Sequence, residues 1–162
     1  MARYIPDGKL RVVWVETLAD PSAPTQTEID GGEDLTGFLR SLSTPLEGSV
    51  VDVSDPTTKF NKTAAGTYGG QELTAEWYRD DTQANDTAFV TLDRGATGAF
   101  VICRRGGSGT DGAIDTGDFV EVWSGLEVIT RNPADYSRNE PDGFSTSFAV
   151  QDEPEMDVAV VA

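Results

Sequence analysis

The chain of 162 residues contains no histidine and a single cysteine, Cys103. Without histidine there is neither a Ser-His-Asp triad nor a Cys-His pair, and the usual zinc sites lack their ligands. One cysteine excludes an intrachain disulfide. The remaining chemistry is that of carboxylates, lysine, tyrosine, serine and threonine, or of metals bound by oxygen ligands.

Long apolar runs are also lacking. No run approaches the ~20 residues that a membrane helix needs. The N-terminal sequence MARYIPDGKLRVVWV has neither the long apolar stretch nor the small-residue cleavage site of a secretory signal peptide. We therefore expect no membrane insertion and a cytoplasmic location at synthesis.

Positive charge is scarce, since Lys9, Lys59 and Lys62 are the only lysines. The formal net charge is -16 and the pI about 4.1. Such a surface repels nucleic-acid phosphates, so tight DNA binding through a basic face is not expected. The acidity has three interpretations: solubility, adaptation to high salt, or a surface that must not adhere to a polyanion. Composition alone favours solubility.

What is present is a series of short, strand-like segments within one predicted domain spanning residues 1–162. We predict strands over residues 10–16, 49–54, 71–79, 98–104, 118–130 and 144–150. Ser124 and Gly125 predict a bulge or bend in the fifth of these. Residues 25–28 form a capping box that predicts a short helix, and residues 84–92 predict a further α-helix.

These elements predict a mainly β fold. We expect an antiparallel β-sandwich or small barrel of two packed sheets, with one flanking α-helix over residues 84–92. Trp14, Trp77 and Trp123 fall on predicted strands and are expected in the core, as is Cys103.

Three groups of residues resemble reactive sites, but none of them is good evidence for one. The glycine-rich residues 105–112 lack the Gly-Lys-Ser/Thr ending of a phosphate-binding loop. The acids between residues 80 and 86 do not have calcium-loop spacing and are interpreted as acids at a helix N-terminus. Glu72 and Glu76 share a strand face, which is interpreted as a solvated or lumen-facing sheet surface. We predict no catalytic residue, no metal site and no cofactor.

Residues 52–70, DVSDPTTKFNKTAAGTYGG, hold two of the three lysines, Lys59 and Lys62, together with Phe60 and Tyr68. The segment lacks helix or strand periodicity and predicts a long loop over about residues 55–70. One interpretation is a solvated connection, but so long a loop is uncommon unless it is functional or disordered. The aromatics argue against disorder. Because the most abundant acidic surface is that of another copy of the chain, self-association is natural.

An ordered set of segments also carries a family resemblance. The set is MARYIPDGKLRVVWV, EIDGGEDLTGFL, KFNKTAAGTYGG, LTAEWYRDDTQANDTAFVTLDRG, FVICRRGG, VEVWSGLEVITRNP and SFAVQDEPEMDVAVVA. In this order, over nearly the whole chain, it resembles the major tail tube proteins of long-tailed (siphovirus-type) bacteriophages, especially those that infect actinobacteria.

The resemblance implies two packed antiparallel sheets, and hexameric rings stacked into a hollow tube through which DNA passes at ejection. The loop at about 55–70 would reach the neighbouring ring. An N-terminal arm and first strand at about 1–24, and a C-terminal arm at about 154–162, would complete the contacts. The candidate inter-ring residues are Lys59, Phe60, Asn61, Lys62 and Tyr68; Glu72 and Glu76 are candidate lumen-facing acids.

The implied partners are further copies of the chain, a tape measure protein, and tail terminator and tip proteins. Genomic DNA would pass without tight binding, since six copies at -16 each present only net negative charge to the duplex. The implied location is the virion tail, with assembly in the host cytoplasm. The alternatives are another tail assembly or completion protein, a secretion-system tube protein, and a carboxylate-based β-sandwich hydrolase.

Overall fold

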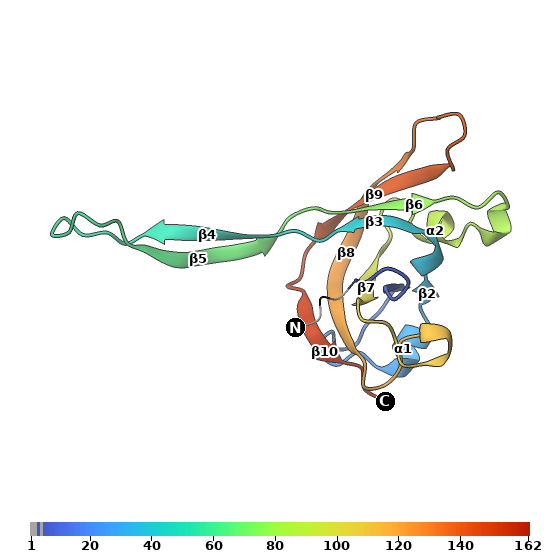
Figure 1. Ribbon diagram of the computed structural model, residues 1–162, viewed down its shortest axis with the longest axis horizontal. Coiled ribbons are helices and arrows are strands. Elements are labelled where there is room, and N and C mark those ends of the chain that lie inside the picture. The colour runs from blue at the N-terminus through green and yellow to red at the C-terminus, as the bar shows by residue number, and fades with distance from the viewer. Residues whose placement is uncertain (1–2, 4) are drawn as a thin grey trace.

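The computed structural model describes residue 3 and residues 5–162 (Figure 1). Met1, Ala2 and Tyr4, which belong to the predicted N-terminal arm, lie outside the described residues. The strands are β1 (Arg11–Val15), β2 (Glu33–Asp34), β3 (Leu39–Ser43), β4 (Leu46–Asp52), β5 (Thr63–Gly70), β6 (Leu73–Tyr78), β7 (Thr97–Cys103), β8 (Phe119–Pro133), β9 (Gly143–Val150) and β10 (Glu155–Ala159). The helices are α1 (Gln26–Asp30) and α2 (Thr87–Thr91), with 3-10 turns η1 (Thr36–Phe38), η2 (Gln83–Asn85) and η3 (Thr110–Gly112).

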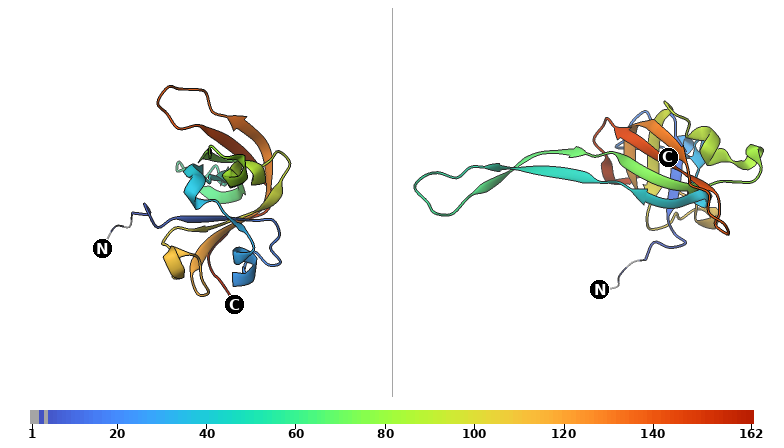
Figure 2. Two further views of the ribbon diagram at one scale, coloured as in Figure 1. Left: turned by 90° about the vertical axis from the view of Figure 1, so that its right-hand side faces the viewer. Right: turned by 90° about the horizontal axis from the view of Figure 1, so that it is seen from above.

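The strands form two antiparallel sheets, which confirms the predicted mainly β fold. The larger sheet has eight strands in the order β2-β1-β7-β8-β9-β6-β3, with β10 added beside β8, and the smaller sheet is the pair β4-β5. The larger sheet folds over so that its β1-β7 part faces its β9-β6 part, in the manner of a sandwich (Figure 2). Within the described residues its end strands β2 and β3 do not pair, so it is not a closed barrel.

The bend that folds the large sheet lies in β8 at Ser124–Gly125, where the sequence predicts a bulge. The register of β8 against β7 shifts between Gly98 and Phe100, which places the extra residue on β8 at this point. Gly125 has φ +61°, a left-handed conformation that glycine adopts readily. Residues on both sides of the bend pair with β7, whereas only those from Leu126 onward pair with β9. Strand β8 therefore belongs to both halves of the fold.

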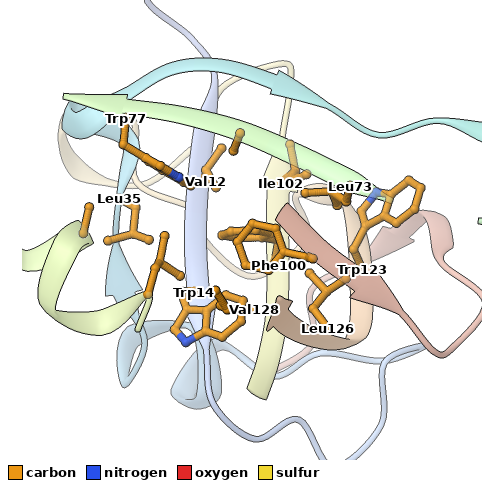
Figure 3. Close-up of a cluster of buried hydrophobic side chains, with 14 of the residues drawn as sticks. Val12, Trp14, Leu35, Leu73, Trp77, Phe100, Ile102, Trp123, Leu126 and Val128 are labelled. Atoms are coloured by element: carbon orange, nitrogen blue, oxygen red, sulfur yellow. The ribbon is translucent and has the colours of Figure 1, made fainter. Parts of the chain in front are cut away.

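Aromatic side chains fill the space between the two halves (Figure 3). Phe100 lies at the centre, with its ring centroid 5.0 Å from Trp14, 6.0 Å from Trp77 and 5.1 Å from Phe148. Edge-on and tilted pairs of this kind add to the free energy gained by burial. All three tryptophans are buried, as the sequence predicts.

A second apolar cluster lies on the other face of β1, β7 and β8. It contains Val101 and Cys103 from β7, Val122 from β8, Ile29 from α1 and Val160 from the C-terminal segment. Because β7 is covered on both faces, its sequence reads as a continuous apolar run rather than an alternation.

One of the two predicted helices forms as expected, and the other is shorter than the sequence suggests. The capping box is present at α1, where Thr25 and Glu28 satisfy each other's backbone amides. The helix predicted over residues 84–92 is wrong in extent: a turn of 3-10 helix precedes a five-residue α2. Asp86 interrupts the segment because its backbone is not helical and its carboxylate pairs with Arg79 instead of capping α2.

The C-terminal segment lies against the domain. Strand β10 pairs with β8, and the backbone of Val161 bonds with Pro24 and Gln26. Residues 155–161 of this chain are therefore held by the same domain that carries the first strand.

Candidate functional site

The feature that dominates the molecular shape is a two-stranded arm that projects from the domain (Figure 1). It consists of β4 and β5, paired from Leu46↔Gly70 to Asp52↔Thr63, with residues 53–62 at its tip. The predicted loop at 55–70 is thus wrong in structure, since residues 63–70 form a strand. The strand predicted over residues 49–54 overlaps β4. Strand β5 buries neither face and so needs no alternation of apolar and polar residues, which is why its sequence shows no period.

The arm is a continuation of the β3-β6 pair of the large sheet. Ser43 pairs with Thr74 inside the domain, and the amide of Gln71 donates to the carbonyl of Pro45 (3.2 Å) where the arm leaves it. Gly70 allows this exit because a Cβ there would lie 2.9 Å from a methyl carbon of Val150. At ~3.3 Å per residue, the seven residues of β4 carry the tip roughly 23 Å outward.

The arm exposes apolar side chains that a solvated hairpin would not need. Val50 is 73% exposed, Phe60 75% and Tyr68 59%, and Val51 and Val53 are also exposed. An isolated two-stranded hairpin is marginal in water, and its outer edges keep unpaired backbone groups that can template another chain. These properties are those of a surface that gains stability from a partner.

Hydrogen bonds order the tip. The Ser54 hydroxyl accepts from the Lys62 amide (2.8 Å), and the Val53 amide donates to the Lys62 carbonyl (2.9 Å). The hydroxyl and amide of Thr57, together with the Lys62 ammonium, hold the pKa of Asp55 below its usual range.

The two lysines of the tip differ in their surroundings. The Nζ atom of Lys62 lies 3.4 Å from Asp55, whereas Lys59 has no ion-pair partner in the part of the chain that the structure describes. Lys59, Phe60, Asn61 and Lys62 thus cluster on the tip, while Tyr68 lies on β5 opposite Gly48, nearer the domain.

The candidate lumen-facing acids lie near the base of the arm. Glu76 is exposed on β6 and accepts from the Ser41 hydroxyl of β3 (3.2 Å); Glu72 is exposed in the turn that precedes β6. Leu73, Ala75 and Trp77 point into the core. The predicted alternation of β6 is therefore confirmed, with Thr74 and Glu76 on the face away from the core.

A pocket that the sequence does not predict lies at the α2 end of the domain. Its volume is about 440 Å³, and it lies between η2 and α2 on one side and Arg79 and Arg131 on the other. The ring of Phe89 is held between the guanidinium carbons of Arg79 (3.7 Å) and Arg131 (3.9 Å), a double cation–π contact. Asp86 is buried and pairs with Arg79 at 2.7 Å. Its position near the other acids of residues 80–86 gives no indication that it pairs with Arg79, seven residues earlier.

The charges of the pocket do not cancel. Arg79 is neutralised by Asp86, and Arg131 pairs with Asp93 at 3.1 Å. Asp80 and Asp81 also line the pocket, and neither has an ion-pair partner among the described residues. Residues 3 and 5–162 contain no cluster of His, Cys, Asp or Glu suited to a metal ion. They also include no helix long and apolar enough to cross a membrane.

Comparison with known proteins decides the family. The phage tail tube protein family model matches residues 1–162. The chain belongs to the phage tail tube protein family. Membership agrees with the resemblance seen in the sequence and assigns the chain a structural role in a tail tube. No curated protein matches the chain.

Solved structures share the tail tube protein's fold at low sequence identity. A sheath/tube terminator of an extracellular contractile injection system has a TM-score of 0.64 at 10% identity, over 96% of this chain and 98% of that chain. A chain of the anti-feeding prophage baseplate gives 0.58 at 14%, over 96% and 97%. A chain of a gene transfer agent virion gives 0.54 at 13%, over 96% and 98%. These likenesses extend over nearly the whole fold.

Proposed function

We propose that this chain is the tail tube subunit of a long-tailed, siphovirus-type phage particle of the kind that infects actinobacteria. Six copies form a ring, rings stack into a hollow tube, and DNA passes through the lumen at ejection. The β4-β5 arm carries this proposal, because it projects from a completed domain and exposes apolar side chains together with Lys59, which has no ion-pair partner among the described residues. Family membership supports it independently.

In this proposal the arm tip makes the ring-to-ring contact through Lys59, Phe60, Asn61 and Lys62, and Tyr68 contributes nearer the base. The rest of the surface is acidic, so like-charged subunits repel one another at long range. Burial of Phe60, at about 2 kcal/mol for a fully buried side chain, and lysine contacts to acids oppose that repulsion. The terminal segments at about 1–24 and about 154–162 contribute to the contacts through their exposed residues, because β1 and β10 stay paired within the domain.

The lumen is proposed to be acidic. Glu72 and Glu76 supply charge to its wall, so that the duplex slides without gaining counterion-release affinity. A tape measure protein would occupy the lumen before DNA, and terminator and tip proteins would close the two ends. Assembly takes place in the host cytoplasm, and the product is the virion tail. A tube reconstruction with Glu72 and Glu76 on the outer wall would contradict the lumen assignment.

Charge reversal of the tip tests the proposal. Lys59→Glu combined with Lys62→Glu should shorten or abolish tubes seen by negative-stain electron microscopy of concentrated protein. Arg105→Glu with Arg138→Glu is the matched control, because it changes the net charge equally at two exposed residues outside the arm. Tubes of ordinary length from the lysine variant would contradict a role for these lysines.

A second candidate is a tube or tube-terminating subunit of a contractile system. The sheath/tube terminator of an extracellular contractile injection system favours it, because it shares this fold with a TM-score of 0.64. Copy number per particle separates the two: a tube subunit is present in many copies, and a terminator in few.

A further inference from the structure

The arm tip and the α2 pocket lie at opposite ends of the molecule. Figure 1 is drawn with the longest axis horizontal, and it shows the tip at one extreme and α2 near the other. The view from above in Figure 2 shows the same separation. A contact between two different surfaces at opposite ends repeats head to tail and builds an open stack rather than a closed dimer.

The two ends are complementary in charge. At the pocket, Asp80 and Asp81 remain after the two arginines are paired with Asp86 and Asp93. At the tip, Lys59 carries the charge that no described ion pair neutralises. In a chain with three lysines and 28 acids, these are opposite charges placed at the two ends that a stack brings together.

The two ends also match in apolar surface. Phe60 is 75% exposed at the tip, and Val90 of α2 is 59% exposed beside the pocket. The faces of the Phe89 ring are occupied by the two guanidinium groups, so Val90 and the ring edge are the apolar surface still open to a partner. The contact between Phe89 and Phe144, with centroids 5.1 Å apart, fixes this surface to the core.

We propose that the arm tip of one copy seats in the α2 pocket of the next copy along the stack. Lys59 lies against Asp80 and Asp81, and Phe60 lies on Val90. This assignment rests on the proposed stacking of the subunit into a tube and names the surface that receives the arm. It gives Arg79, Asp86 and Arg131 a purpose: they hold Phe89 and α2 in a fixed position beneath the incoming tip.

Paired cysteines test the contact directly. Phe60→Cys and Val90→Cys in one chain should give, after mild oxidation, a ladder of disulfide-linked multimers that collapses to monomer with reductant. Either single variant should give dimers at most, and wild-type Cys103 should not react because it is buried. The control chain carries Phe60→Cys with Tyr136→Cys, because Tyr136 is exposed on a different projecting turn.

Microscopy of the same samples separates the two proposals. Tubes with a ladder only for the 60/90 pair support the docking site. Tubes without that ladder, or with the ladder from the 60/136 pair, overturn the docking site and leave the tube function standing. Absence of tubes from the concentrated wild-type protein overturns the proposed function itself.

A charge swap covers the case in which the cysteine variants do not assemble. Lys59→Glu should raise the protein concentration needed for tube formation by up to roughly fivefold, the size expected for an exposed ion pair. Adding Asp81→Lys should restore assembly, whereas adding Asp135→Lys, an exposed acid outside the pocket, should not. Equal effects of the two added lysines would overturn the pairing.

Discussion

Replacing Asp86 by asparagine tests whether a buried ion pair holds the α2 end of the domain in place. The Asp86 side chain is 1% exposed, its Oδ2 lies 2.7 Å from Nε of Arg79, and its Oδ1 accepts from the Asp80 amide at 3.3 Å. Asparagine keeps the size of the side chain but removes the charge. The guanidinium of Arg79 then lacks its carboxylate.

The expected loss of stability follows from the exposed fractions of the Asp86 and Arg79 side chains. Removing one partner of a fully buried pair costs about 3–5 kcal/mol, and a hydrogen bond to a charged group contributes about 1.5–3 kcal/mol. Arg79 is 29% exposed and can regain part of its hydration, so the lower range applies, at about 2 kcal/mol. For a chain of 162 residues each kcal/mol shifts Tm by ~2–4 °C, which gives an expected fall of roughly 4–8 °C.

Thermal unfolding followed by circular dichroism, at a concentration that keeps the protein monomeric, measures this shift. Asp81→Asn is the matched control, since Asp81 is an exposed acid in the same segment and should change stability by no more than about 0.5 kcal/mol. Indistinguishable Tm values for the two variants would refute this reasoning, because the Asp86–Arg79 pair would then not stabilise the α2 end of the domain.

Three further predictions concern other parts of the molecule. Replacing residues 53–62 with Asn-Gly, a turn that preserves the Asp52↔Thr63 pairing, should leave the Tm of the domain unchanged but abolish tubes in micrographs. Gly98→Ala should lower the free energy of unfolding by about 1–3 kcal/mol in urea titrations, because the new Cβ would lie 2.7 Å from the Trp14 ring; Gly48→Ala, in open space, should not. The Ala19 amide, followed by the amide and hydroxyl of Thr25, lowers the pKa of Glu28 below its ordinary 4.5. The ionised Glu28 carboxylate therefore contributes to the free energy of unfolding above pH 4.5, and this contribution is lost as the pH falls through the lowered pKa. Glu28→Gln should be less stable than wild type near neutral pH, and the two stabilities should converge in acid.

The sequence predicts well the elements whose burial imposes a period. The alternation of residues 73–77 identifies β6, the apolar run in residues 99–103 identifies β7, and the capping box identifies α1. Burial of one face, burial of both faces and capping of a helix end each require particular residue types at nearby positions, and these can be recognised in the sequence. The bulge at Ser124–Gly125 is also local, because a left-handed residue favours glycine.

The parts that escape prediction depend on contacts distant in the chain or on no contact at all. The β4-β5 arm buries neither face, so residues 63–70 show no period, whereas the strand predicted over residues 49–54 overlaps β4. The pocket forms where Arg131 of β8 reaches Phe89 of α2, a pairing that no local pattern encodes. Asp86 looks like any helix N-terminal acid until Arg79 is placed beside it.

A helical reconstruction of tubes formed by the concentrated wild-type protein would show directly how the subunits stack. We expect stacked rings of six subunits, with each β4-β5 arm crossing the junction between rings and its tip beside α2 of the next copy. Tubes in which the arm points into solvent, or in which the arm tip contacts only its own ring, would contradict this arrangement.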